Sequence, residues 1–394
     1  DLSVTDMHVL IVACIITSSC YTTAAVRGQS NDAHTDTCRD THSYISTDPH
    51  TETETETGIH SKLVFADGAS YEGEVQEGRI HNYGKYTYPD GSVYEGQFSN
   101  GKVTGKGKYV FANGKIYEGD FVDSKMHGHG VMVFSDGTKY TGEFYQNARE
   151  GRGTIQFADG SVYNGEHKHN RINGLGSMKY PSGDMYEGSW KDEVKHGKGT
   201  MHFYSGKVYD GYWADDSMHG HGVMTYPDGK VFNGNYYHNK KSGHGTLTLT
   251  DGSIYEGEFK GNKMHGIGIM KFADGAVYTG EWVENNIHGH GTMTFNSESY
   301  TGMWQSNQRH GFGRMEFTDG AVYEGQFSSN SIEGFGRMTY FNGEVYEGVW
   351  SVGELVDTTI LNSMRRWALH VVGRSYTFLL SLFLKCCVCF HNIE

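Results

Sequence analysis

The chain has 394 residues, a formal net charge of −14, 55 glycines, 27 tyrosines and only 4 prolines. Gly is about twice as frequent as in average proteins, which favours a repeat architecture over the core of an ordinary enzyme. The acidic balance is the opposite of the basic surface with which proteins bind DNA or RNA, so no nucleic-acid partner is predicted.

The N-terminal segment, residues 1–60, carries a charge of −7 and does not share the pattern that follows it. From Met7, the stretch MHVLIVACIITSSCYTTAAVRG has a short apolar core and small residues near Ala24 and Ala25. A secretory signal peptide has these features, but the basic residues that usually precede the core are missing. The polar, Thr-rich stretch ending in TETETETG is predicted to be a disordered linker.

From residue 61 to residue 354 the sequence repeats one short unit. A Tyr-x-Gly triplet, once with Phe in place of Tyr, recurs every 23 residues, with a single interval of 22. The aromatic residues of the triplets are Tyr71, Tyr94, Tyr117, Tyr140, Tyr163, Tyr186, Tyr209, Phe232, Tyr255, Tyr278, Tyr300, Tyr323 and Tyr346. This fixed period indicates a stacked array of thirteen units, each of which packs mainly against its neighbours.

Within each unit, glycines and large aromatic residues share one face of the expected strands. Around Tyr140 the residues at even spacing are Gly128, Gly130, Met132, Phe134, Gly142 and Phe144. Side chains at even spacing point to one side of a strand, so we expect rings from a neighbouring strand to lie on bare glycine backbone. The residues taken to define the repeat are Tyr94, Gly96, Tyr117, Gly119, Gly128, Gly130, Tyr140, Gly142, Tyr186, Gly188, Trp190, Tyr255 and Gly257.

Two kinds of connection are expected between the strands. Asp-Gly pairs predict tight hairpins, for which we favour a three-residue loop with Phe134 facing Tyr140, although the sequence alone leaves the register open. The other connection, from Tyr145 to Glu150 in this unit, is expected to be longer and polar. The unit that ends at Tyr300 reads FNSESY and lacks both the Asp-Gly pair and one residue, which predicts a local defect.

The succession Tyr-Glu-Gly-x-Phe/Trp, then Gly-x-Gly, then Asp-Gly resembles the MORN (membrane occupation and recognition nexus) repeat over residues 61–354. Together with the period, the resemblance implies an all-β fold, a single-layer twisted ribbon of about 13 tandem β-hairpins with a short helical tail at the C-terminus. Thirteen hairpins correspond to about 26 strands and to a ribbon on the order of 120 Å long.

The family resemblance transfers the fold better than the function. MORN repeats occur in junctophilins, plant phosphatidylinositol-phosphate kinases, radial-spoke head proteins, some lysine methyltransferases and protist cytoskeletal scaffolds. The kinases and methyltransferases carry separate catalytic domains, and only 44 residues follow Trp350. We therefore expect a scaffold-type protein built from MORN repeats alone.

Odd spacing from each repeated Tyr predicts an opposite face that is rich in carboxylates. These residues are Glu72, Glu95, Glu118, Glu187, Asp210, Glu256, Glu324 and Glu347, one residue after the aromatic, and Glu74, Asp120, Glu143, Glu166, Glu258 and Glu281, three residues after it. One interpretation is a solvated face that discourages aggregation between sheet edges. The functional interpretation is a docking stripe for a basic partner.

Basic residues recur fifteen residues before a repeated Tyr, where they could form a positive rim for anionic lipid or a partner. They are Arg79, Lys102, Lys125, Arg171, Lys240 and Lys263. The charge of −9 over residues 61–354 opposes strong attraction of the whole array to an anionic membrane, whereas contact through the rim alone is less affected. The alternative interpretation is that these residues only solubilise the loops.

No catalytic, cofactor or metal site is predicted. The Gly-x-Gly pairs do not open a helix, and neither a Gly-x-x-x-x-Gly-Lys-Ser/Thr nor a His-Glu-x-x-His motif occurs. Histidines recur in columns, as at His127 and His129, but equivalent histidines in adjacent units should lie roughly 10 Å apart, too far to share a metal ion. An open ribbon also offers no closed pocket that would shift carboxylate pKa values toward catalysis.

The C-terminal segment, residues 355–394, has a charge of +2 and an apolar run broken by Arg374 and Lys385. The run is marginal for a membrane span, but Cys386, Cys387 and Cys389 beside it could accept palmitoyl chains. A membrane-associated tail is one hypothesis, and a helix that caps the last hairpin is another. A wrongly assigned exon would also explain the change in composition.

These features favour a non-catalytic scaffold or adaptor for proteins at a membrane or cytoskeletal structure. The alternatives are direct binding of anionic phospholipid at membrane contacts, and a targeting module related to the lipid kinases. An exposed aromatic face would allow a homodimer. None of the six cysteines lies between residues 61 and 354, which favours the cytoplasm over secretory entry.

Overall fold

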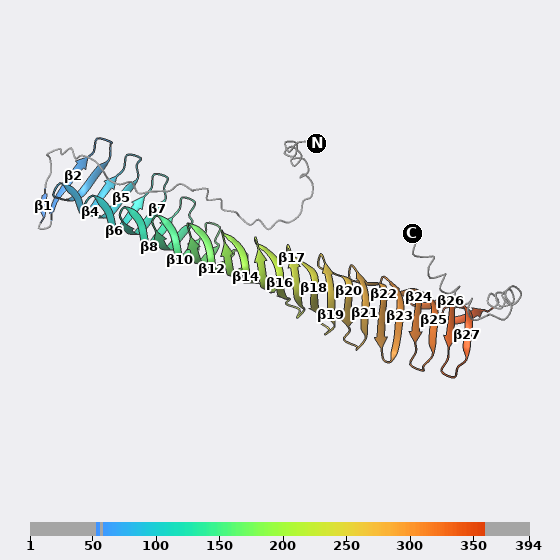
Figure 1. Ribbon diagram of the computed structural model, residues 1–394. Helices are drawn as coiled ribbons and strands as arrows, with labels where there is room; N and C mark the ends of the chain where they lie inside the picture. Colours follow the sequence, from blue (N-terminus) through green and yellow to red (C-terminus); the bar gives the residue numbers. More distant parts are fainter. Residues whose placement is uncertain (1–52, 56–57, 359–394) are drawn as a thin grey trace, which may run out of the picture. The chain divides into compact units, whose positions relative to one another are not determined.

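The computed structural model describes residues 53–55 and 58–358, which form 28 strands and no helix (Figure 1). The first fourteen strands are β1 Thr53–Thr55, β2 Gly58–Val64, β3 Ser70–Gln76, β4 Arg79–Thr87, β5 Val93–Ser99, β6 Lys102–Val110, β7 Ile116–Val122, β8 Lys125–Val133, β9 Lys139–Tyr145, β10 Ala148–Gln156, β11 Val162–Lys168, β12 Arg171–Lys179, β13 Met185–Lys191 and β14 Val194–His202. The others are β15 Val208–Ala214, β16 Ser217–Thr225, β17 Val231–Tyr237, β18 Lys240–Thr248, β19 Ile254–Lys260, β20 Lys263–Lys271, β21 Val277–Val283, β22 Asn286–Phe295, β23 Glu298–Gln305, β24 Gln308–Glu316, β25 Val322–Ser328, β26 Ser331–Thr339, β27 Val345–Ser351 and β28 Glu354–Asp357.

The strands form one open antiparallel sheet in which each strand pairs with its neighbours in the chain (Figure 1). This arrangement confirms the prediction of an all-β ribbon of tandem hairpins. The sheet also begins earlier than expected, since Thr53–Thr55, within the predicted linker, forms β1 and pairs with β2. The signal-like stretch and residues 359–394, which hold most of the expected tail, lie outside the described residues.

The Asp-Gly hairpins close through three-residue loops, as predicted. In the loop between β8 and β9, the amide of Phe134 donates to the carbonyl of Thr138 over 2.8 Å, and the amide of Gly137 donates back to Phe134 over 3.0 Å. Gly137 has a φ of +90°, a conformation that a residue with a side chain rarely adopts. The expected cross-strand partner was wrong, because Tyr140 lies opposite Met132 rather than Phe134.

The second connection is shorter than predicted. Tyr145 pairs with Ala148, so only Gln146 and Asn147 form the turn, and both have positive φ, at 47° and 72°. This is the geometry of a type I′ turn, which matches the right-handed twist of the flanking strands. The polar residues that we expected in a long loop, including Glu150, are therefore already part of strand β10.

The unit that lacks one residue does not interrupt the sheet. Between β22 and β23, Phe295 pairs with Glu298, and Asn296 and Ser297 form a two-residue turn with φ of 46° and 70°. Met293 still lies opposite Tyr300, as Met132 lies opposite Tyr140. The predicted defect is therefore confined to the turn, which absorbs the deletion without a change of register.

Each repeated aromatic from Tyr71 to Tyr323 lies across a pair of facing glycines. A Cβ on Gly119, which follows Tyr117 in strand β7, would lie 2.5 Å from the Tyr117 hydroxyl oxygen. A Cβ on Gly130, the partner of Gly119 in strand β8, would lie 2.4 Å from a Tyr117 ring carbon. The second contact confirms that a ring from the neighbouring strand covers a glycine, and the first shows that the ring covers its own strand as well.

The rings also pack against each other along the array and form its core. Tyr117 meets Phe121 edge-to-face at a centroid distance of 5.1 Å and meets Phe144, from the next unit, at 4.9 Å. Such edge-to-face pairs add to the free energy gained by burial. Twelve of the thirteen repeated aromatics are buried, eleven of them with 0–1 % of their surface exposed; Tyr346 at the C-terminal end is the exception. We call this side of the sheet the inner face and the opposite side the outer face.

Gly128 has a different role from the one predicted. No ring lies on it; its φ is +59°, and the pairing of β7 with β8 shifts register at this point. A Cβ there would lie 2.7 Å from a carboxylate oxygen of Asp120. The glycine is needed because the β-bulge requires left-handed backbone, for which glycine has no steric penalty.

Candidate functional site: the outer face and the turn rim

The outer face carries the residues that follow each repeated aromatic, and most of them are exposed. Near the N-terminal end, Lys62 lies 3.9 Å from Glu72, and near the C-terminal end Arg314 lies 3.5 Å from Glu324. Between these ends the same rows carry mostly uncharged residues, such as Thr154 and Thr246. Exposed ion pairs contribute little to the free energy of unfolding, so a partner that displaces them would cost the fold little. The two rows are therefore accessible to a partner.

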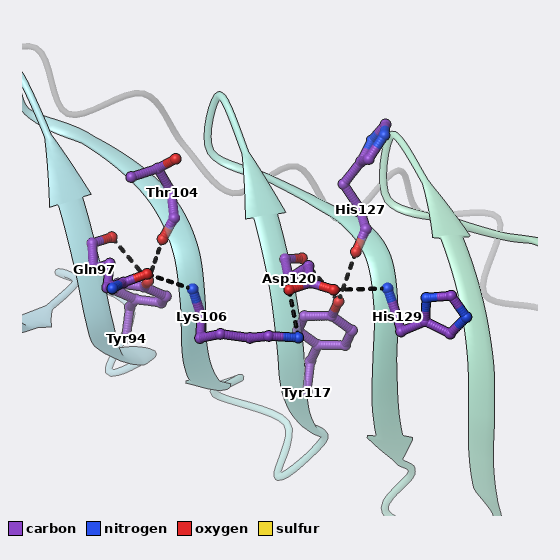
Figure 2. A network of polar contacts seen from close by, with 8 residues as sticks. All are labelled: Tyr94, Gln97, Thr104, Lys106, Tyr117, Asp120, His127 and His129. Carbon is purple, nitrogen blue, oxygen red and sulfur yellow. Dashed lines mark hydrogen bonds and ion pairs between the residues drawn. The ribbon is translucent and has the colours of Figure 1, made fainter.

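The carboxylates three residues after the Tyr have a structural role that sequence reasoning missed (Figure 2). Asp120 accepts a hydrogen bond of 2.9 Å from the amide of His129, which follows the bulge glycine. Glu143 accepts the equivalent bond from Arg152 at 3.0 Å, and Gln97 does so from Lys106 at 2.8 Å. These side chains satisfy an amide that the bulge removes from the strand ladder.

The ion pair at this position also stabilises the charged form of Asp120. The ammonium group of Lys106 lies 2.5 Å from its carboxylate (Figure 2). Desolvation alone would raise the pKa of Asp120, but Lys106 and the amide of His129 together hold it below its ordinary value. The predicted acidic stripe therefore consists of two different rows. Most of the carboxylates one residue after the aromatic are exposed, and most of those three residues after it bind backbone amides at the bulges.

The six basic residues of the predicted rim occupy equivalent places, each at the first position of a strand after a two-residue turn. They are Arg79 in β4, Lys102 in β6, Lys125 in β8, Arg171 in β12, Lys240 in β18 and Lys263 in β20. Three of them pair with a carboxylate in the next turn: Lys102 with Asp123 at 3.2 Å, Arg171 with Asp192 at 3.4 Å and Lys263 with Glu284 at 3.1 Å. The turn rim therefore has mixed charge.

Successive turns on the rim are also joined by hydrogen bonds that sequence reasoning missed. The side-chain oxygen of Asn147 accepts a bond of 2.8 Å from the amide of Met126, and the Asn147 amide donates to the Met126 carbonyl over 3.0 Å. Equivalent bonds, each from the second residue of the strand that follows the preceding two-residue turn, reach Asn170, Asp216, Asn239, Asn262, Asn285, Asn307 and Asn330. The recurrence of Asn sixteen residues before the Tyr was the signal that could have revealed these links.

Four cations replace apolar residues on the inner face. Arg149, Lys195, Lys241 and Arg309 lie fourteen residues before a repeated aromatic, where other units have Val, Met or Ile. Lys195 lies 3.5 Å from the carboxylate of Asp216, but the residue equivalent to Asp216 beside Lys241 is Asn262. The Lys241 ammonium instead lies 4.6 Å from the centre of the Phe232 ring, and burial lowers its pKa to about 8.

His167 takes the place of the Phe or Trp that most other units have four residues after the Tyr. Its ring packs edge-to-face against Tyr140 at 4.9 Å and Tyr163 at 5.3 Å. Both ring nitrogens are buried and have no hydrogen-bond partner among the described residues. Burial, with a smaller contribution from the nearby Arg149 guanidinium, lowers the pKa of His167 to about 4.

The surfaces are open. A hollow of about 770 Å³ on the outer face over strands β4–β9 has a floor of glycine backbone and walls that include Tyr83, Lys106 and His129. Within residues 53–55 and 58–358, no group of three or more His, Cys, Asp or Glu side chains could hold a metal ion. The same residues include no helix with the length and apolar character that a bilayer span requires. Cys386, Cys387 and Cys389 lie outside the described part of the chain.

The protein is a β-repeat array. Its hairpins share one repeating sequence and form a single antiparallel sheet, and its core consists of aromatic rings that lie on glycines. The family model for the MORN repeat matches twelve consecutive units, from residues 71–93 to residues 323–345. The chain belongs to the MORN-repeat family. The thirteenth Tyr-x-Gly triplet, at Tyr346, lies beyond the last matched repeat.

Comparison with curated proteins finds no significant match. Among solved structures, the TCP domain of SAS-4 from Drosophila melanogaster, in complex with a proline-rich motif of Ana2, is 16% identical; the match covers 40% of this chain and 89% of that domain, with a TM-score of 0.27. The TCP10 domain of Danio rerio CPAP, in complex with a STIL peptide, is 12% identical over 76% of this chain and 99% of that domain, with a TM-score of 0.14. These likenesses are too weak to inform function.

Proposed function

We propose that the protein is a non-catalytic scaffold or adaptor that holds partner proteins along a membrane or cytoskeletal structure in the cytoplasm. MORN repeats are known for protein- and membrane-associated interactions, and MORN-repeat proteins are generally non-catalytic modules. The observation that carries the proposal is the outer face, on which equivalent exposed positions recur on hairpin after hairpin of an open sheet. Repeated positions of this kind suit several weak contacts made at once, which together give a high overall affinity.

The inner face supports the choice of the outer face as the interaction surface. The homodimer prediction required an aromatic face that the array leaves exposed, but the repeated rings, such as Tyr186 and Trp190, are already buried by their own array. The outer rows retain exposed carboxylates, including Glu95, Glu118 and Glu187. A basic segment of a partner protein is the chemistry that these rows complement.

The test compares capture of partner proteins by the full chain and by outer-face variants. Glu→Gln substitutions at Glu95 and Glu118, then also at Glu187 and Glu256, remove charge from exposed positions without touching the bulges. Because the contacts act together, capture of the same proteins at fixed salt should fall steeply with each pair of substitutions. Capture that is unchanged by all four substitutions would contradict the proposal.

Direct binding to anionic phospholipid is the alternative, and the turn rim provides the test for it. Arg79, Lys125 and Lys240 have no carboxylate in the next turn, in contrast to Lys102, Arg171 and Lys263. If lipid binding by the array is the function, Gln at the first three positions should abolish sedimentation with phosphatidylserine vesicles, and Ser at Cys386, Cys387 and Cys389 should not. The opposite result would favour a scaffold with a lipid-modified tail.

A further inference from the structure

The C-terminal end of the array exposes an unusual amount of apolar surface. Six large apolar residues within residues 340–356 are exposed: Tyr340, Phe341, Val345, Tyr346, Val352 and Val356. Phe341 at the loop tip is 81 % exposed, and Val352 in the last turn is 80 % exposed. The rings of Tyr340 and Tyr346 lie together, with centres 5.7 Å apart, whereas Phe341 and Val352 lie in the turns at the two ends of strand β27. Exposed apolar side chains gathered in one place normally mark a surface that another segment or molecule covers.

The exposure of Tyr346 follows from the absence of a further repeat. The ring of each earlier Tyr rests on a glycine thirteen residues later, as Tyr323 rests on Gly336. Thirteen residues after Tyr346 the sequence has Thr359 in place of the glycine. Tyr346 is accordingly 45 % exposed, and strand β27 pairs with β28 only from Val349 onward.

We propose that residues 359–394, which directly follow strand β28, fold back and cover this apolar end. The chain leaves β28 at Asp357, beside the exposed Val356 and opposite Val349 of β27. The segment contains the apolar run FLLSLFL from Phe378 to Leu384, which can supply the missing contacts. Because the two parts belong to one chain, the effective concentration of the segment at this end is on the order of millimolar or higher.

Charge complementarity favours this segment over a second copy of the array as the occupant. Residues 359–394 carry four basic residues, Arg365, Arg366, Arg374 and Lys385, and one acidic residue, Glu394. The last hairpins carry the carboxylates of Glu333, Glu344, Glu347 and Glu354. A second array would instead bring another strongly acidic surface, so its approach would be opposed by repulsion.

The experiment measures amide hydrogen exchange in the full chain, in a buffer without membranes. Leu379→Asp with Phe383→Asp places charges in the apolar run of the segment and leaves the sequence of the array unchanged. Amides in β27 and β28 should exchange at least about tenfold faster in this variant, while amides in β9–β20 keep their rates. Unchanged rates in β27 and β28 would overturn the proposal.

Two controls separate the segment from other sources of protection. Ile11→Asp with Ile15→Asp makes the same chemical change in the other apolar stretch of the chain and should leave β27 and β28 unaffected. If this control accelerates exchange there as strongly, the protection is not specific to residues 359–394. The rates should also be the same over a hundredfold range of protein concentration, because protection that grows with concentration would identify a second copy as the occupant.

Discussion

At the scale of single residues, the fold depends on rings that lie on backbone without side chains. Tyr117 contacts Gly119 and Gly130 so closely that a Cβ on either glycine would overlap it. The Tyr117 hydroxyl also donates to the carbonyl of Asp120 over 2.9 Å, which fixes the ring along its strand (Figure 2). Burial raises the pKa of the equivalent Tyr140 to about 12, so the hydroxyl remains a donor at any physiological pH.

Replacing a glycine under a ring should therefore cost more than replacing a glycine in a loop. For Gly130→Ala we expect a loss of about 3 kcal/mol in the free energy of unfolding, because the buried ring of Tyr117 must move. Gly114→Ala is the control, since nothing lies within 4 Å of its Cβ and only the left-handed conformation, with a cost of about 1 kcal/mol, opposes it. Equal losses in urea unfolding would show that the ring is not the cause.

His167 is a natural exception to the aromatic pattern and should weaken its own unit. His167→Phe removes two buried nitrogens that have no hydrogen-bond partner in the described part of the chain and restores the ring that neighbouring units use. We expect the free energy of unfolding to increase by about 1–2 kcal/mol, which would be measured as a shift of the urea midpoint to higher concentration. The reverse change, Phe144→His, places an imidazole in the same setting one unit away and should lose a similar amount.

The same residue should make stability depend on pH. The folded pKa of His167, about 4, lies below the ordinary value of 6.5, so the unfolded chain takes up the proton first as the pH falls. Stability is therefore expected to fall as the pH is lowered from about 6.5 to about 4, and His167→Phe should reduce that slope. If the free energy of unfolding changes equally with pH in the two proteins, His167 is not the source of the pH dependence.

At the scale of the strand and its turns, the unit around Tyr140 combines a loop, a tight turn and a bulge, and a side chain supports each one. Asp136 accepts the Thr138 amide over 2.8 Å in the loop, and Asn147 accepts the Met126 amide over 2.8 Å at the turn. Glu143 accepts the Arg152 amide at the bulge. The recurrent polar residues of the repeat therefore satisfy backbone groups that the strand ladder leaves over.

The bulge contact can be tested in both directions. Glu143→Ala removes the acceptor for the Arg152 amide and should cost about 1 kcal/mol. Ser189, in the equivalent position beside Gly197, is too short to reach the amide of Lys198, so Ser189→Glu should add the missing contact and stabilise that unit. Thermal unfolding of the two variants should shift in opposite directions, and shifts of the same sign would show that the contact contributes nothing.

The sequence predicted the array itself and much of its core, because a 23-residue period and even spacing directly determine which residues share a face. It could not predict the register around Tyr140 or the brevity of the turn at Asn147, because both depend on the twist that neighbouring strands impose. The carboxylate of Asp120 was attributed to the surface because its role depends on the bulge at Gly128. The cations at Lys195 and Lys241 were missed because each replaces an apolar residue in only a few units.

At the scale of the whole molecule, each strand pairs only with its neighbours and its rings reach the next unit, so a local defect should remain local. Tyr209→Ala empties a fully buried ring position in the middle of the array. Amides in strands β14–β17 should then exchange faster by a factor that corresponds to about 3–5 kcal/mol, while those in β3–β6 keep their rates. Acceleration along the entire sheet would mean that the array unfolds as one cooperative unit.

The turn at Asn296 and Ser297 has a practical consequence for anyone who wishes to modify this protein. One hairpin here closes with fewer residues than its neighbours and keeps the alignment of Met293 with Tyr300. The length of a loop can therefore change without a change in the register of the strands that it joins. The tips of the hairpin loops are exposed to solvent. A short epitope or a fluorophore-binding sequence inserted after Gly160 or Gly252 should therefore report on the location of the protein in a cell without disturbing the surfaces on either side.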